Sequence, residues 1–360
     1  MSTRSPLSLL SALVLAMACG LTAAAAAPAS AAPPASAPAT AAAAGLPADP
    51  NIRYFGRWDT SSATGYVPEW AGAYAVIAFT GRTVELRQRG SVDLYASIDG
   101  GAFRSYANVS GVVNLTPSPL ASVTHTLRVS YRPVEGSYHG DDVFQGVILA
   151  SGAHTVTPTV PSKIIEFIGD SITVGYRSSQ EALTAYGWLT AERLGAGHTQ
   201  IARSGACLYP SADGCIGMRD RWLRTGVSAT SPMWNFSRYQ AGAVVINLGT
   251  NDLGHHVTSA QFEGAYVALL HEIRARYPDA TIFAMETFKQ WLVSETRAAV
   301  ASVTAAGDNR VRYVDTEGWI NPSTDTADGT HPTDAGHRKI AARLAPIVAS
   351  ALGWNDHMAP

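Results

Sequence analysis

The chain has 360 residues, of which 15% are charged, and a net charge of −2, so we expect no strong electrostatic field around it. No basic stripe with interleaved aromatic residues is present, which argues against nucleic acid as a partner. Hydrophobic residues make up 46% of the chain, which is enough for a sizeable core, and the length allows two domains.

The first 31 residues are typical of an export signal. Arg4 supplies a positive charge, residues 9–17 are apolar, and Ala29-Ser30-Ala31 matches a cleavage site. Cys19 leaves an alternative open, a lipoprotein anchored through this residue. No later apolar run approaches the roughly 20 residues that span a bilayer. We therefore expect a secreted, extracellular protein whose mature form is not in the membrane.

Residues 32–50 are mostly alanine, proline and serine and are predicted to be a linker. From 51 to 157 the sequence has the features of a domain of strands. Apolar and polar side chains alternate with period two, most clearly at 92–98 and 123–131, and glycine turns separate the runs. This pattern indicates a β-sandwich.

From residue 158 to 360 short apolar strands alternate with helices, and we take this segment as the second domain. Strands are expected at 163–168, 243–248, 281–285 and 311–314, and helices at 185–194, 261–277, 291–306 and 333–352. Such alternation predicts a parallel sheet with helices on both faces. Ligands bind beyond the carboxyl ends of the strands in such sheets, so reactive residues are expected there.

Two segments after predicted strands contain a serine and a histidine of the kind used in nucleophilic catalysis. Ser171, in GDSI, lies at a strand-to-helix turn, and its hydroxyl needs an adjacent base to become a nucleophile. The GDSI segment alone is equally typical of a helix N-cap. His331, in DGTHP, follows Asp328 by three residues, so that one turn presents an orienting carboxylate and a base. Asp325 is an alternative orienting residue, and Asp170 is expected to shape the turn.

Two further segments supply candidate hydrogen-bond donors for an oxyanion. Gly205 offers a backbone N–H, and Asn251, in GTND after a predicted strand, offers a side-chain amide. Loss of one such donor commonly costs about 10²–10³ in rate. Each residue has an ordinary interpretation by itself, Gly205 in a turn and Asn251 as a loop cap.

The segments GDSI, SG, GTND and DGTHP resemble the four conserved blocks of the SGNH (GDSL-type) hydrolase superfamily over about residues 164–352. The resemblance implies a three-layer α/β/α domain with Ser171 as nucleophile and Asp328 and His331 completing a triad. It also implies an oxyanion hole formed by the N–H groups of Ser171 and Gly205 and the amide of Asn251.

The amino-terminal segments GRWD, WAGAY, FTG, IDGG and FQG resemble the jelly-roll domain of carbohydrate esterase family 2. That family pairs a jelly roll with an SGNH domain and deacetylates plant cell-wall polysaccharides. The resemblance implies a secreted acetyl esterase whose substrate is an acetylated polysaccharide or oligosaccharide of the xylan or glucomannan type. No metal-ligand set is visible, the chemistry requires no cofactor, and no obligate protein partner is evident.

Two cysteines, Cys207 and Cys215, remain after removal of the export signal. In an oxidising compartment they are expected to form a disulfide that closes a short loop, which would stabilise the fold by roughly 2–3 kcal/mol. A metal pair or a catalytic thiol lacks supporting histidines at ligand spacing. His255 and His256 are expected to be loop residues. Five tryptophans are candidates for stacking on sugar rings: Trp188, Trp222, Trp234, Trp291 and Trp319.

Two other functions remain open from the sequence. The first is a general short-chain acyl esterase or lipase on the same fold, since a fold does not fix a substrate. The second is a non-catalytic carbohydrate-binding protein. Hydrolysis of a chromogenic acetate ester separates the binding protein from both enzymes, and comparison of acetate with octanoate esters separates the two enzymes.

Overall fold

The computed structural model describes residues 44–131, 143–210 and 213–357. The predicted export signal, its Cys19 and the predicted linker up to residue 43 lie outside this part. Residues 44–50, the end of the predicted linker, form turns that pack on the strands. The carbonyl of Gly45 accepts a hydrogen bond from the Val147 N–H at 2.8 Å, and the carboxylate of Asp49 accepts one from the Thr155 hydroxyl at 2.7 Å. The folded chain therefore begins before the expected boundary at residue 51.

Seven strands between Ile52 and Val156 form an antiparallel region in the described part of the chain. They are β1 (Ile52–Asp59), β2 (Val67–Gly81), β3 (Val84–Ile98), β4 (Arg104–Asn114), β5 (Val123–Tyr131), β6 (Val143–Leu149) and β7 (Thr155–Val156). Strand β3 pairs with β4, β5 and β6, and β2 pairs with β1, β5 and β7. The predicted runs at 92–98 and 123–131 lie within β3 and β5. The jelly-roll topology of this region stays a prediction.

Strand β2 connects the two regions of the molecule. All residues from 70 to 79 are buried, so the strand has no polar face and no period-two alternation that would reveal it in the sequence. Ala71 of β2 pairs with Gln200 of strand β9 (Gly197–Ala202). Through this pairing the antiparallel strands and the parallel strands belong to one continuous sheet, and the described residues all belong to one compact unit.

The second region has parallel strands with helices between them, as predicted. Its strands are β8 (Ile164–Gly169), β9, β10 (Ala243–Asn247), β11 (Thr281–Met285) and β12 (Val311–Val314). Its α-helices are α1 (Ser171–Val174), α2 (Tyr186–Arg193), α3 (Met218–Arg221), α4 (Ser259–Arg276), α5 (Val293–Ala305) and α6 (Asp334–Leu352), with two 3₁₀ turns at Glu181–Thr184 and Phe236–Arg238. The strand order is β12-β11-β10-β8-β9.

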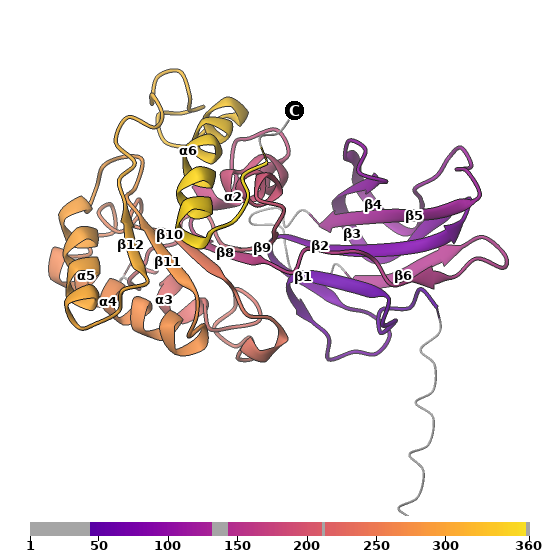
Figure 1. Cartoon of the computed structure of the whole chain (residues 1–360), viewed down its shortest axis with the longest axis horizontal. Helices are drawn as coiled ribbons and strands as arrows, with labels where there is room; N and C mark the ends of the chain where they lie inside the picture. Colours follow the sequence, from indigo (N-terminus) through magenta and orange to yellow (C-terminus); the bar gives the residue numbers. More distant parts are fainter. Residues whose placement is uncertain (1–43, 132–142, 211–212, 358–360) are drawn as a thin grey trace, which may run out of the picture. The chain divides into compact units, whose positions relative to one another are not determined.

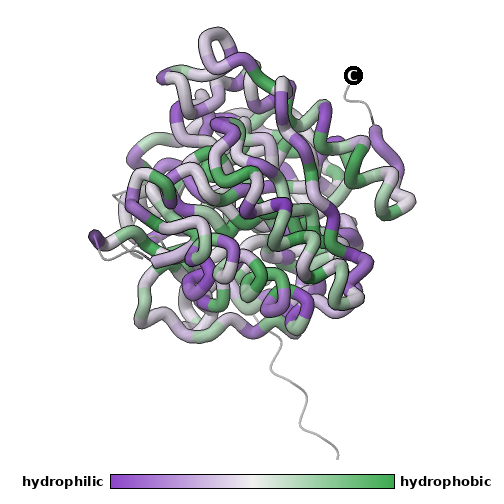
Figure 2. The backbone as a smooth tube through the Cα atoms, turned by 90° about the vertical axis from the view of Figure 1, so that its left-hand side faces the viewer, coloured by the Kyte–Doolittle hydropathy of each residue, from purple (hydrophilic) through white to green (hydrophobic). Residues whose placement is uncertain are grey.

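Helices cover both faces of the parallel strands because successive strand residues point to opposite sides. Ile246 packs in one core with Phe262 of α4 and side chains of α5. Val245 packs in a second core with Tyr186 of α2 and Leu344 of α6. Figure 1 shows α2 and α6 on one side of these strands and α3 and α4 on the other. In Figure 2 hydrophobic stretches of the backbone gather toward the middle of the view, with hydrophilic loops around them.

The order of the strands determines where a site can form. Strands β8 and β10 are neighbours, although β9 lies between them in the sequence and pairs on the other side of β8. The connections from β8 and β10 therefore leave the sheet in opposite directions and open a crevice at the carboxyl ends. Ser171 follows β8, and Asn251 follows β10.

Among the described residues, no helix combines the length and apolar character that a membrane span requires.

Candidate active site

Ser171 is the first residue of the short helix α1, directly after β8. Asp170 caps this helix, since its carboxylate accepts a hydrogen bond from the Ile172 N–H at 3.0 Å. This confirms the expectation that Asp170 shapes the turn. Burial raises the pKa of Asp170 to about 7. The buried side chain of Ser171 contacts the segment that connects β12 to α6.

His331 lies in that segment, 160 residues further along the chain. Its Nε2 is 2.9 Å from the Oγ of Ser171, and its Nδ1 is 2.8 Å from the Oδ2 of Asp328. The other carboxylate oxygen of Asp328 accepts the backbone N–H of His331 at 2.9 Å. Burial would raise the pKa of Asp328, but these hydrogen bonds outweigh it and lower the pKa to about 2. The carboxylate is therefore ionised at neutral pH and holds the imidazole from one side.

Asp325, the alternative orienting residue, is not brought to His331. Its buried carboxylate accepts hydrogen bonds from the Asn321 N–H at 2.8 Å and from the ammonium of Lys339 at 2.6 Å. Its backbone carbonyl accepts the Thr333 N–H at 2.9 Å. Asp325 thus links the segment between β12 and α6, residues 315–333, here called the histidine loop, to Lys339 of α6.

The three candidate oxyanion donors follow the carboxyl ends of three neighbouring strands, β8, β9 and β10. No acceptor for the backbone N–H of Ser171 or Gly205 is found among the described residues. Gly205 has a φ of +71°, and a Cβ added there would contact nothing within 4 Å. The amide of Asn251 donates to the carbonyl of Ala206 at 2.8 Å and is 3.5 Å from the carboxylate of Asp170. Both of its hydrogens therefore have an acceptor within the protein, and the contact with Asp170 is the longer of the two.

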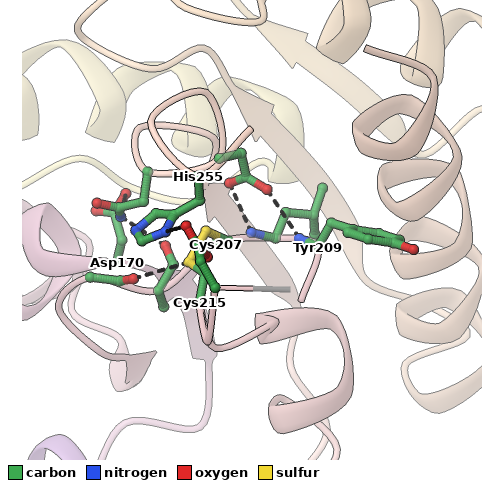
Figure 3. Close-up of a disulfide and its surroundings, with 11 residues drawn as sticks. Asp170, Cys207, Tyr209, Cys215 and His255 are labelled. Atoms are coloured by element: carbon green, nitrogen blue, oxygen red, sulfur yellow. Dashed lines mark hydrogen bonds and ion pairs between the residues drawn. A yellow bond between two sulfur atoms is a disulfide. The ribbon is translucent and has the colours of Figure 1, made fainter. Parts of the chain in front are cut away.

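The predicted disulfide between Cys207 and Cys215 is present, with Cα atoms 5.9 Å apart. Figure 3 shows it close to His255, whose Nδ1 is 2.8 Å from the carboxylate of Asp213. In the described part of the chain, the one group of three potential metal ligands is these two sulfurs with His255. Because a metal binds thiolates and both sulfurs are oxidised, this group does not fit a metal.

Tyr176 contacts His331 and Arg177 contacts Asp328, and the sequence did not predict either contact. The ring of Tyr176 stands edge-on to the His331 imidazole, with 4.8 Å between the centroids. The Nε of Arg177 is 3.9 Å from the carboxylate of Asp328, and the guanidinium lies over the Tyr176 ring. These residues follow the short helix α1, where no spacing in the sequence indicates their direction.

Of the five candidate tryptophans, four are buried: Trp188, Trp222, Trp234 and Trp319. Trp291 is 37% exposed and lines a cavity of about 410 Å³ together with Lys289 and other residues. The ammonium of Lys289 lies over the Trp291 ring and donates to the carbonyl of Gly329 at 3.2 Å. Because Gly329 lies between Asp328 and His331, this contact links Trp291 to the histidine loop.

Comparison with known proteins identifies the family. The model of the GDSL-like Lipase/Acylhydrolase family matches residues 167–339. A solved structure of a family two carbohydrate esterase from Clostridium thermocellum, in complex with cellohexaose, is 30% identical with a TM-score of 0.75. The match covers 84% of this chain and 100% of that one. The chain belongs to carbohydrate esterase family 2.

Two curated proteins agree with this assignment. The family 2 chain is 31% identical over 330 residues to the cellulase/esterase CelE of Acetivibrio thermocellus, and the match covers 85% of the chain but only 40% of CelE. It is 26% identical over 255 residues to the acetylxylan esterase / glucomannan deacetylase of Cellvibrio japonicus, covering 64% of the chain and 68% of that protein. These matches confirm the resemblance to the GDSL-type superfamily and to carbohydrate esterase family 2. They also confirm the prediction of an ester-hydrolysing enzyme.

Proposed function

We propose that this family 2 esterase is secreted and removes O-acetyl groups from plant cell-wall polysaccharides of the xylan or glucomannan type. The observation that carries the proposal is the continuous chain of contacts from Ser171 through His331 to Asp328, at 2.9 and 2.8 Å. This series of contacts lies at the carboxyl ends of parallel strands, where this class of sheet binds its ligands.

The first half of the reaction uses His331 as a base. Its Nε2 takes the hydroxyl proton of Ser171 as Oγ attacks the carbonyl carbon of the ester. The ionised carboxylate of Asp328 faces Nδ1, keeps the proton on that nitrogen and stabilises the imidazolium. Collapse of the tetrahedral intermediate breaks the bond to the sugar oxygen, which leaves with the proton from Nε2.

The second half releases the acetyl group from Ser171. His331 takes a proton from a water molecule, whose oxygen attacks the acyl carbon, and then returns the proton to Oγ as acetate departs. In both halves the negative oxygen requires hydrogen-bond donors. The N–H groups of Ser171 and Gly205 fit this role, because they have no acceptor among the described residues. The Asn251 amide would exchange its long contact with the Asp170 carboxylate, at 3.5 Å, for one with the oxyanion.

Trp291 is the residue best suited to contact the sugar chain. It is the exposed member of the five candidate tryptophans, and Lys289 connects it to the loop of His331. Aromatic rings offer a flat apolar surface that a pyranose can cover. Two relatives support a polysaccharide substrate by what their names state, since one is crystallised with cellohexaose and another is an acetylxylan esterase / glucomannan deacetylase.

The test is acetate release from acetylated xylan, acetylated glucomannan and cellulose acetate, with the Ser171→Ala variant as the control. We expect release from at least one of the first two polymers and none from the control. In parallel, 4-nitrophenyl acetate should be hydrolysed faster than the octanoate ester. Preference for octanoate would favour the general acyl esterase or lipase, and binding of polymer without turnover of any ester would favour the non-catalytic protein.

A further inference from the structure

The backbone at Gly205 needs an external restraint if its N–H is to serve as an oxyanion donor. Gly205 lies in the left-handed region with a φ of +71°, where glycine is free to change conformation. It has no side chain to pack, and nothing lies within 4 Å of the place where a Cβ would be. An N–H group that is displaced by about 1 Å from its working position loses much of its effect on the rate.

The segment after Gly205 is held by two side chains that follow β10. The amide of Asn251 donates to the carbonyl of Ala206 at 2.8 Å. The buried carboxylate of Asp252 accepts the N–H groups of Leu208 at 2.9 Å and Tyr209 at 3.1 Å. These contacts fix residues 206–209. The peptide group between Gly205 and Ala206 has one backbone hydrogen bond of its own, from the Ala206 N–H to the Arg203 carbonyl at 3.3 Å.

The disulfide adds a second contact to this peptide group, at the carbonyl of Gly205. The Sγ of Cys215 is 3.3 Å from the carbonyl oxygen of Gly205, and Cys207 is only two residues further along the chain. The Cys207 half of the disulfide is held in turn by backbone pairing with the segment that follows Cys215. The Cys207 N–H donates to the Ile216 carbonyl at 3.0 Å, and the Met218 N–H donates to the Cys207 carbonyl at 2.8 Å. Both cysteines are buried. In Figure 3 the disulfide and the hydrogen bonds of the Tyr209 segment lie side by side.

We propose that the Cys207–Cys215 disulfide is a positioning element for the oxyanion-binding N–H of Gly205, so that the esterase is fully active only in its oxidised form. The proposal rests on the proposed serine mechanism. It predicts an effect on the chemical step, because the interaction that is weakened exists mainly in the tetrahedral state.

The direct test is reduction of the native protein. Two thiols of dithiothreitol convert the disulfide to two cysteine thiols and themselves become a cyclic disulfide. After removal of the reductant by gel filtration, we expect kcat for 4-nitrophenyl acetate to be about 10- to 100-fold lower, with KM within twofold of its oxidised value. Reoxidation should restore kcat. The Cys207→Ser/Cys215→Ser variant should resemble the reduced enzyme and should not respond to dithiothreitol.

A matched control separates this effect from general loosening of the loop. His255→Ala removes the contact between His255 and Asp213 beside the disulfide but leaves the disulfide intact, and its kcat should stay within twofold. Near-UV circular dichroism and thermal unfolding establish that the reduced protein is folded at the assay temperature.

Two results would overturn the proposal. One is an unchanged kcat after two new thiols have become titratable. The other is a loss of activity that follows the unfolded fraction alone. Residual activity of Ser171→Ala would instead contradict the proposed function, so the two failures are distinguishable.

Discussion

The guanidinium of Arg57 in β1 lies 3.6 Å from the carboxylate of Glu166 in β8, and neither side chain is exposed to solvent. Arg57 also donates to the backbone carbonyl of Arg224 at 2.5 Å and stacks over the rings of Trp222, Trp234 and Phe236. Glu166 accepts hydrogen bonds from Tyr277 at 3.0 Å and from Trp222 and Tyr239. A buried charge pair thus joins the two regions of the chain, and one of its members lies on β8, the strand that leads to Ser171.

We predict that Arg57→Met lowers the free energy of unfolding by about 3–5 kcal/mol, because it leaves the Glu166 carboxylate buried without its cation. The double variant Arg57→Met/Glu166→Gln should lose less than the sum of the two single variants. Urea unfolding of the four proteins gives the coupling energy. Additive losses would mean that the ion pair contributes nothing beyond the packing of each side chain.

Removal of the nucleophile or the base should abolish catalysis without loss of the fold. We expect Ser171→Ala and His331→Ala each to lower kcat for acetate esters by at least about 10⁴-fold, because nucleophile and base act as a unit. Circular dichroism and the melting temperature serve as the folding check. A folded Ser171→Ala protein with more than a few per cent of the activity would exclude the serine mechanism.

The two aspartates of the histidine loop should respond differently. Asp328→Ala is expected to lower kcat less than His331→Ala, and the double variant should be no worse than His331→Ala alone. Asp325→Ala should lower the melting temperature, because Lys339 loses its buried partner, while kcat changes little. A larger loss of kcat in Asp325→Ala than in Asp328→Ala would reverse the assignment.

The buried carboxyl of Asp170 should make stability depend on pH. Burial raises its pKa from 3.8 to about 7. Its contribution to the free energy of unfolding is therefore full below pH 3.8 and is lost as the pH rises through 7. Asp170→Asn keeps an acceptor for the Ile172 N–H but carries no charge. Relative to the wild type, the variant should therefore gain stability between pH 5 and pH 8. If urea unfolding gave the same pH dependence of stability for both proteins, the raised pKa of Asp170 would be contradicted.

Trp291 offers a test of polysaccharide recognition that is separate from the chemistry. Trp291→Ala should raise KM for acetylated polysaccharide several-fold, because a stacking surface is lost, and should leave kcat for 4-nitrophenyl acetate within about twofold. Val112→Ala, an exposed apolar residue of β4, is the control and should change neither value. An equal loss on both substrates would indicate that Trp291 supports the histidine loop instead.

The sequence predicted the parallel strands and helices well where amphipathic or apolar patterns were local. It failed at β9, whose His198, Thr199 and Gln200 are polar in sequence but buried in the structure. Ser171, Asp328 and His331 were predictable because each follows a strand and because Asp328 and His331 share one turn. The sequence did not predict the contacts of Tyr176 and Lys289 or the hydrogen bond from the Asn251 amide to Ala206. Long-range packing alone decides where these side chains point.

The pairing of Ala71 with Gln200 has a consequence for attempts to divide the protein. Strand β9 is the last strand of the parallel set, and its outer neighbour in the sheet is β2 of the antiparallel region. Excision of the chain at residue 158 would uncover the backbone groups of β9 as a free edge, open to pairing with strands of other molecules. The same cut would remove Arg57 and leave the buried Glu166 carboxylate without its cation. The hydrolase region is therefore expected to aggregate when expressed alone.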